Sequence, residues 1–329
     1  MRRAPPVEFP QERDRANRLG RRLAWATIGY YLIDMTVMYL VIGRSQAMKA
    51  AWLQDVFAIV PPVGFLVAAR LVCKKPNDRF PYGYHRAVSV AFFFAALSLI
   101  GVGVYLVVDS LVPFVRGEHP TIGVFRLFGY QVWLGWPMFA GLIFSSALPP
   151  YFLGRMMFAP AKVMHDKVLY ANAEMQKAGW LSAAAALVGV AGIGFGVWWF
   201  DYAAALVISL LILKDGVTSA REALSILMDE APRTTDFAAA DPARARIKTY
   251  LESLDWVAEA VVRLREEGHV FFGDALVVPK DQRGLMSKLH QAIAGVKALD
   301  WRIYDFSIMP VPELNDDTEA RPERATVEG

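Results

Sequence analysis

The stretch AVSVAFFFAALSLIGVGVYLVV, Ala87–Val108, contains no Asp, Glu, Lys or Arg and is long enough to cross a lipid bilayer. A transmembrane helix needs about 20 predominantly apolar residues. Two more stretches without these charged residues run over Leu127–Gly154 and Ala178–Phe200. A single stretch could be a buried core helix, but six in one chain predict an α-helical membrane protein with six transmembrane helices. The other three are Leu23–Gly43, interrupted only by Asp34; Val56–Ala69, extended back to Ala50; and Tyr202–Leu213, extended toward Thr218.

The composition favours a bilayer environment. The chain has 329 residues, of which 55% are hydrophobic and 20% charged, and its mean hydropathy is +0.30. This is too apolar for an ordinary soluble protein, so the lipid bilayer is the expected solvent. Cys73 is the only cysteine, which excludes an intrachain disulfide and a Cys-x-x-Cys metal motif.

Positive charge is concentrated at alternate ends of the predicted spans. The N-terminus and the second-to-third and fourth-to-fifth linkers are rich in Arg and Lys, whereas the opposite linkers hold only Arg44, Lys49, Arg116 and Arg126. Basic residues mark cytoplasmic loops, so we expect both termini in the cytoplasm and the protein in the inner or plasma membrane. The same rule accounts for the N-terminal arginines, and we predict no nucleic-acid partner.

The chain divides into a membrane part and a small soluble part. Residues 1–21 are polar and Arg-rich, which predicts a disordered cytoplasmic arm, and residues 22–228 hold the six spans. A polar linker at 229–240 leads to a compact domain at 241–314, and the acidic residues 315–329 are predicted to be a disordered tail.

The 241–314 domain shows apolar patterns typical of helices and of strands, one after the other. Apolar residues at helical spacing precede two β-branched runs, Val257–Arg265 and Val270–Val278, joined by Glu266-Glu267-Gly268. A second helical pattern then precedes the alternating run Trp301–Pro310. The order αββαβ predicts a ferredoxin-like two-layer domain on the cytoplasmic side.

Three local motifs complete the pattern. Arg79–Arg86 reads RFPYGYHR at the start of the third span, Trp199–Leu206 reads WFDYAAAL at the start of the sixth, and Leu227–Pro232 reads LMDEAP after it. With six spans and an αββαβ tail, residues 22–314 resemble the cation diffusion facilitator family of divalent-metal/proton exchangers. The resemblance implies a homodimer with a metal cation and protons as its substrates.

The usual metal ligands of that family are missing. The resemblance implies two Asp or His residues four apart on the second helix and two more on the fifth, which suit a tetrahedral zinc-like ion. Here the second-helix positions hold Gln54 and Ala58, or Asp55 and Ile59 after a one-residue shift, and the fifth-helix positions hold Met175 and Gly179. A standard zinc site is therefore not predicted.

Two acidic residues lie beside the vacant positions. Asp55 lies about 22 Å along its helix from Arg70. Glu174 lies about 20 Å along the fifth helix, which runs in the opposite direction. The two side chains could therefore meet at a similar depth in the membrane. We predict that Asp55 and Glu174 bind the transported cation, and the alternative is that they face an aqueous vestibule. Lys177 could pair with Glu174 or reach an interface. The nearby amides are Gln54, Asn172 and Gln176. A set of carboxylates and amides favours harder ions such as Mn²⁺, Mg²⁺ or Fe²⁺ over zinc.

Several polar residues have weaker assignments. Asp34, near the middle of the first span, is a candidate proton relay, or it bonds to a neighbouring helix. His85, His165 and Asp166, in or beside the basic linkers, could capture a cation from the cytoplasm, or they are ordinary surface groups. Pro61-Pro62 removes two backbone donors and should kink the second span.

We therefore predict an exporter of divalent cations, such as manganese, iron, zinc or cobalt, that works as a cation/proton antiporter by alternating access. No cofactor is expected to be tightly bound. The alternative is a transport-inactive relative that acts as a regulatory or scaffolding subunit. No enzyme is predicted, because Walker, nucleophile-elbow, His-Glu-x-x-His and nucleotide-binding glycine patterns were not found.

Overall fold

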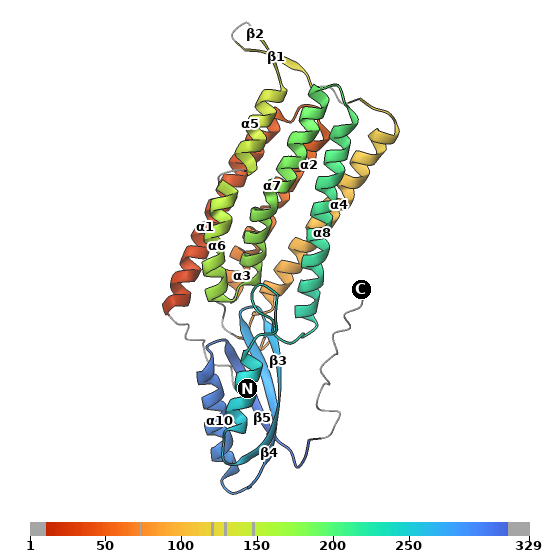
Figure 1. The fold of residues 1–329 in the computed structure, drawn as a ribbon. Coiled ribbons are helices and arrows are strands. Elements are labelled where there is room, and N and C mark those ends of the chain that lie inside the picture. The colour runs from red at the N-terminus through yellow and green to blue at the C-terminus, as the bar shows by residue number, and fades with distance from the viewer. Residues whose placement is uncertain are drawn as a thin grey trace.

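The computed structural model describes residues 11–72, 74, 76–119, 122–127, 130–146 and 149–314. Most of the molecule is a long bundle of helices, and a small α/β domain lies at one end of this bundle (Figure 1). The predicted tail, 315–329, and the first ten residues of the predicted arm lie outside the described residues.

In the described part of the chain, eight helices form the bundle. Five candidate spans found there meet the length and apolarity of a membrane crossing, namely α1, the α2–α3 pair, α4, α7 and α8. The fourth predicted span corresponds to α5 and α6, which lie on either side of residues 147–148, and neither is long enough alone. The bounds are α1 (Gln11–Val41), α2 (Gln46–Phe57), α3 (Val60–Val72), α4 (Ala87–Val115), α5 (Gly135–Ser146), α6 (Pro149–Met164), α7 (Lys167–Gly194) and α8 (Trp199–Leu227).

The predicted arm is too long, because α1 already begins at Gln11. The reason is packing at the start of this helix. Ala16 is buried in the bundle core, and a Cβ atom on Gly20 would lie 3.1 Å from Met164 and 3.2 Å from Leu169. This close approach holds the first turns of α1 against α6 and α7.

The second and fourth predicted spans are both interrupted. α2 ends at Phe57 and α3 begins at Val60, with Pro61 and Pro62 in its first turn, so the second span is interrupted where the prolines predicted a kink. The fourth span begins later than Leu127, because β1 (Val124–Leu127) and β2 (Tyr130–Trp133) pair as an antiparallel hairpin before α5.

The C-terminal domain has the predicted order αββαβ. Its elements are α9 (Ala243–Glu252), β3 (Val257–Glu267), β4 (Val270–Pro279), α10 (Leu285–Leu299) and β5 (Ile303–Pro310). The sheet order is β3-β4-β5, with β3 antiparallel and β5 parallel to β4. Apolar residues from both helices and all three strands form its core.

The β3–β4 turn touches the helical bundle. Gly268 lies in this turn with φ +68°, and a Cβ atom there would lie 2.5 Å from the backbone oxygen of His85. Glycine is the residue that tolerates both the left-handed conformation and this approach. The turn therefore brings the C-terminal domain against the start of α4.

Candidate functional site

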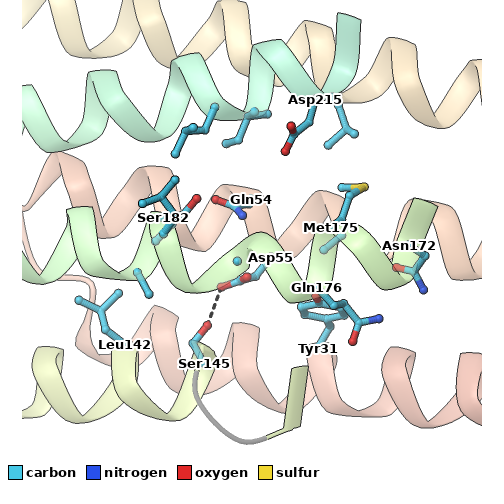
Figure 2. Close-up of a pocket in the computed structure, with 18 of the residues that line it drawn as sticks. Tyr31, Gln54, Asp55, Leu142, Ser145, Asn172, Met175, Gln176, Ser182 and Asp215 are labelled. Atoms are coloured by element: carbon cyan, nitrogen blue, oxygen red, sulfur yellow. Dashed lines mark hydrogen bonds between the residues drawn. The ribbon is translucent and has the colours of Figure 1, made fainter. Parts of the chain in front are cut away.

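A cavity of about 220 Å³ lies within the helical bundle. It is bordered by α1, α2, α4, α5, α7 and α8, and Figure 2 shows Asp55 from α2 turned toward Ser145 from α5. The polar residues at the cavity are Tyr31, Gln54, Asp55, Ser145, Asn172, Gln176, Ser182, Lys214 and Asp215.

Two carboxyl groups meet at one side of this cavity. Ser145 Oγ lies 3.1 Å from Asp34 Oδ2 and 3.1 Å from Asp55 Oδ2. Both carboxyl groups therefore lie against the same hydroxyl, and Asp34 is fully buried. Because like charges this close repel strongly away from water, a proton or a cation must accompany the pair.

Amide oxygen atoms face the same space. Gln54, Asn172 and Gln176 all line the cavity, and Asn172 and Gln176 lie one helical turn apart on α7. Among the residues that the structure describes, Gln54 Oε1 and Gln176 Oε1 are buried without a hydrogen-bond partner. Carboxylate and amide oxygens are ligands for harder divalent cations such as Mn²⁺ and Mg²⁺.

Glu174, which was predicted to pair with Asp55, is not among the described residues that line this cavity. Glu174 instead lines a neighbouring cavity of about 290 Å³, together with Tyr170, Glu222 and Asp236. The reason is helical geometry: Glu174 is two residues from both Asn172 and Gln176, which places it on nearly the opposite face of α7. The side chain of Lys177 lies outside the described residues.

Ser145 and Asp215 line the cavity but were not predicted from the sequence. Ser145 is a single hydroxyl in an apolar stretch, and no sequence pattern marks it as the contact of two carboxyl groups. Asp215 on α8 lines both cavities, as do Met175 and Lys214. A signal did exist for Asp215, because the pair Lys214-Asp215 interrupts the last apolar stretch.

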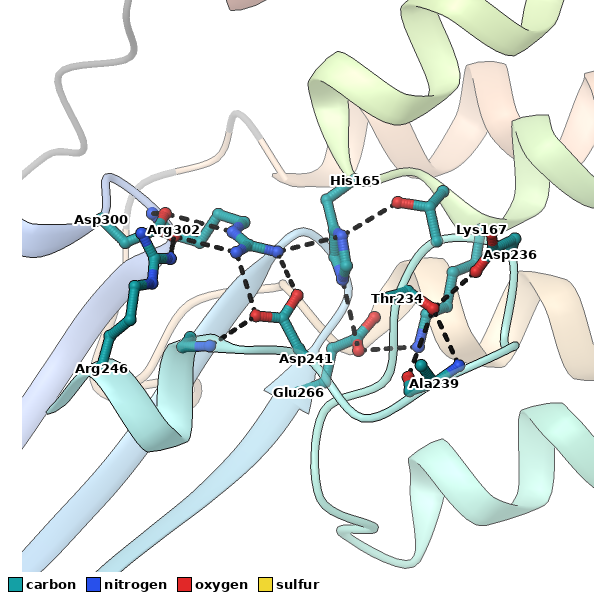
Figure 3. Close-up of polar contacts among 12 residues, drawn as sticks. His165, Lys167, Thr234, Asp236, Ala239, Asp241, Arg246, Glu266, Asp300 and Arg302 are labelled. Carbon is teal, nitrogen blue, oxygen red and sulfur yellow. Dashed lines mark hydrogen bonds and ion pairs between the residues drawn. The ribbon is translucent and has the colours of Figure 1, made fainter. Parts of the chain in front are cut away.

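The three residues predicted to capture a cation are buried where the bundle meets the C-terminal domain, rather than exposed in linkers. His85 packs against the Tyr304 ring, with ring centroids 4.8 Å apart. His165 Nε2 lies 3.5 Å from Glu266 Oε2 (Figure 3). Asp166 caps α7 by accepting the Leu169 N–H at 2.8 Å. Docking of the C-terminal domain covers all three.

An ion pair reinforces this interface. Lys167 Nζ lies 2.8 Å from Glu266 Oε2, and both side chains are buried. Burial alone would raise the pKa of Glu266, but hydrogen bonds and charges from His165 and Lys167 outweigh it and hold the pKa below its ordinary value. Nearby, Arg302 contacts Asp241 at 2.6 Å and Asp300 at 2.9 Å (Figure 3).

Within the described ranges, no group of three or more His, Cys, Asp and Glu residues is placed to hold a metal ion.

The cavity lies in the part of the chain that matches a known family. The family model described as the cation efflux transmembrane domain matches residues 23–228. The chain belongs to the cation efflux family. This confirms the resemblance carried by the three motifs, and it makes the protein a member of a transporter family rather than an enzyme family.

Relatives of this cation efflux protein are described as metal transporters. The chain is 24% identical to the manganese efflux system protein MneS of Bacillus subtilis, with 64% of this chain and 69% of the relative covered. It is also 24% identical to MneP of the same organism, with 65% and 70% covered. An uncharacterized metal transporter of Schizosaccharomyces pombe is 27% identical over 51% of this chain, which spans only 44% of that relative.

Proposed function

We propose that this protein exports a divalent metal cation from the cytoplasm in exchange for protons. The observation that carries the proposal is the cavity inside the bundle, where Asp55 lies beside buried amide oxygens that lack a protein partner among the described residues. A buried carboxylate without a counter-charge is costly, and a cation in the cavity would supply that charge.

Asp55, Gln54, Asn172 and Gln176 are the proposed cation ligands. Asp34 is the proposed proton relay, since the Ser145 hydroxyl lies 3.1 Å from Asp34 and 3.1 Å from Asp55. A proton or a cation can neutralise the carboxyl pair, so the two substrates would compete. Competition of this kind couples cation release to proton uptake when the cavity opens alternately to the two sides of the membrane.

Glu174 is proposed to line the approach to this site rather than to bind the cation within it. The neighbouring cavity supports this role, because it shares Met175, Lys214 and Asp215 with the central cavity. A cation could pass from one to the other along the α7–α8 contact.

The oxygen donors favour manganese or iron over zinc as the exported cation. Two relatives are described as manganese efflux proteins, which agrees with this preference. We further propose a homodimer with six crossings, both termini in the cytoplasm and a ferredoxin-like C-terminal domain. The six crossings require α5 and α6 to act together as the fourth span.

Cation flux into proteoliposomes tests the proposal. Purified protein should move Mn²⁺ in exchange for protons when a proton gradient is imposed across the vesicle membrane. Asp55→Asn should reduce this flux at least about tenfold, because a neutral amide cannot replace the carboxylate charge. The matched control is Asp305→Asn, at a half-exposed carboxylate in the C-terminal domain, which should leave the flux unchanged. If wild-type protein moves none of Mn²⁺, Fe²⁺, Co²⁺ or Zn²⁺, the transport-inactive regulatory role becomes the better explanation.

A further inference from the structure

Two amide side chains at the central cavity share one buried sulfur atom. Asn172 Nδ2 lies 3.4 Å and Gln176 Nε2 lies 3.6 Å from Met157 Sδ. Met157 comes from α6, and all three side chains are buried, with Met157 fully so. The sulfur atom therefore lies where α6 supports the cavity-lining face of α7.

The contact fixes which end of each amide faces the sulfur. A thioether sulfur can accept a hydrogen bond but cannot donate one, so it is approached by the NH₂ end of each amide. The oxygen atoms then lie at the other end of the amide groups. Gln176 Oε1 is buried and has no hydrogen-bond partner in the described part of the chain, although its residue lines the cavity.

We propose that Met157 is a positioning residue that keeps the amide oxygens of Asn172 and Gln176 available to the transported cation. This inference rests on the proposed function, because it assumes a cation in the cavity. A cation is attracted by the oxygen end of an amide and repelled by its NH₂ end. With a hydrocarbon side chain in place of the sulfur, two buried NH₂ groups would lose their acceptor, and each amide would gain by turning toward other polar groups.

The test compares the same substitution at two buried methionines of α6. Met157→Leu conserves volume but removes the acceptor. Met164→Leu is the control, since Met164 is also buried and its sulfur accepts no amide hydrogen bond among the described residues. Calorimetry should show Mn²⁺ binding to Met157→Leu weakened by roughly threefold to tenfold, as expected for the loss of one or two weak hydrogen bonds. The half-saturating Mn²⁺ concentration for flux should rise equally, with unchanged maximal flux, and Met164→Leu should match wild type in both.

Equal Mn²⁺ affinity in Met157→Leu and wild type would overturn the role of Met157 and leave the proposed function standing. Wild-type protein that binds no Mn²⁺ would remove both. If Met157→Leu does not fold, Met157→Gln carries the test, because its carbonyl oxygen can accept from the same amides in a side chain of similar length. A Mn²⁺ affinity of Met157→Gln within about threefold of the wild-type affinity supports the inference, and a larger loss of affinity overturns it.

Discussion

Asp201 is a buried carboxylate that joins two spans. It lies at the start of α8 and accepts hydrogen bonds from the Ser45 hydroxyl at 2.5 Å, the Gln46 N–H at 2.6 Å and the Ala47 N–H at 3.2 Å. The two N–H groups belong to the first turn of α2, where no intrahelical partner exists. The aspartate of the WFDYAAAL motif is therefore a cap for another helix.

Replacing this carboxylate should destabilise the bundle. Asp201→Ala leaves the buried donors at the start of α2 unpaired and should lower the free energy of unfolding by at least about 2 kcal/mol. Thermal unfolding in detergent measures the effect. Asp109→Ala is the comparison, because it removes a carboxylate from the partly exposed ion pair with Lys49 (2.7 Å) and should cost less than about 1 kcal/mol. Equal losses in the two variants would contradict the capping role.

Single histidines show the limit of prediction at this scale. His85 and His165 lie beside basic linkers in the sequence, which suggested surface groups or cation capture. Both are instead buried by residues of the C-terminal domain, such as Tyr304 and Glu266. Linker composition carries no information about which distant segment will cover it.

Helix α7 separates its polar residues by face. Asn172 and Gln176 line the central cavity, whereas Glu174, between them in sequence, lines the neighbouring one. Helical periodicity alone could have shown that Glu174 cannot share a face with the two amides. Depth in the membrane favours a pairing of Asp55 with Glu174, but the direction of each side chain around its helix does not.

Cysteine labelling can test this division of α7. Because Cys73 is the only cysteine, a Cys73→Ser background allows single cysteines at 172, 174 and 176. Mn²⁺ bound through Asp55 should slow thiol modification of the Gln176→Cys variant. It should leave thiol modification of the Glu174→Cys variant unchanged. Mass spectrometry of the modified protein gives the rates. Protection of Glu174→Cys alone would move the cation site to the neighbouring cavity.

At the scale of the whole molecule, polar contacts join the C-terminal domain to the bundle. Lys167 and His165, at the α6–α7 junction, face Glu266 on β3 (Figure 3). Arg86, before α4, also pairs with Asp229 at 2.5 Å and with Glu267 at 3.4 Å. The charges on the two sides are complementary, so the docked arrangement depends on their ionisation.

Docking should weaken in acid. Since the pKa of Glu266 in the folded protein lies below the ordinary value of 4.5, its ionised form stabilises the interface above that pH, and this contribution is lost as the pH falls through the lowered pKa. Hydrogen exchange of the β3–β4 hairpin amides should therefore accelerate as the pH falls below 4.5, after correction for the intrinsic pH dependence of exchange.

Glu266→Gln should weaken docking at neutral pH and reduce this pH dependence, because Lys167 loses its buried counter-charge. The same substitution at Glu252, whose side chain is 39% exposed and lies 3.7 Å from Lys248, is the control and should leave exchange of the hairpin unchanged. If both variants behave as wild type, the ion pair contributes nothing to docking.

The apolar spans, the αββαβ order and the family motifs were readable from the sequence, because apolar length, periodicity and short motifs are local properties of the chain. The sequence also predicted candidate cation ligands from their positions within the spans, namely the carboxylate Asp55 and the amides Gln54, Asn172 and Gln176. Only the tertiary structure decided that Asp55 meets Asp34 and Ser145 rather than Glu174, and that the linker histidines are buried. Such contacts depend on how helices far apart in sequence rotate and pack against one another, which no local pattern specifies.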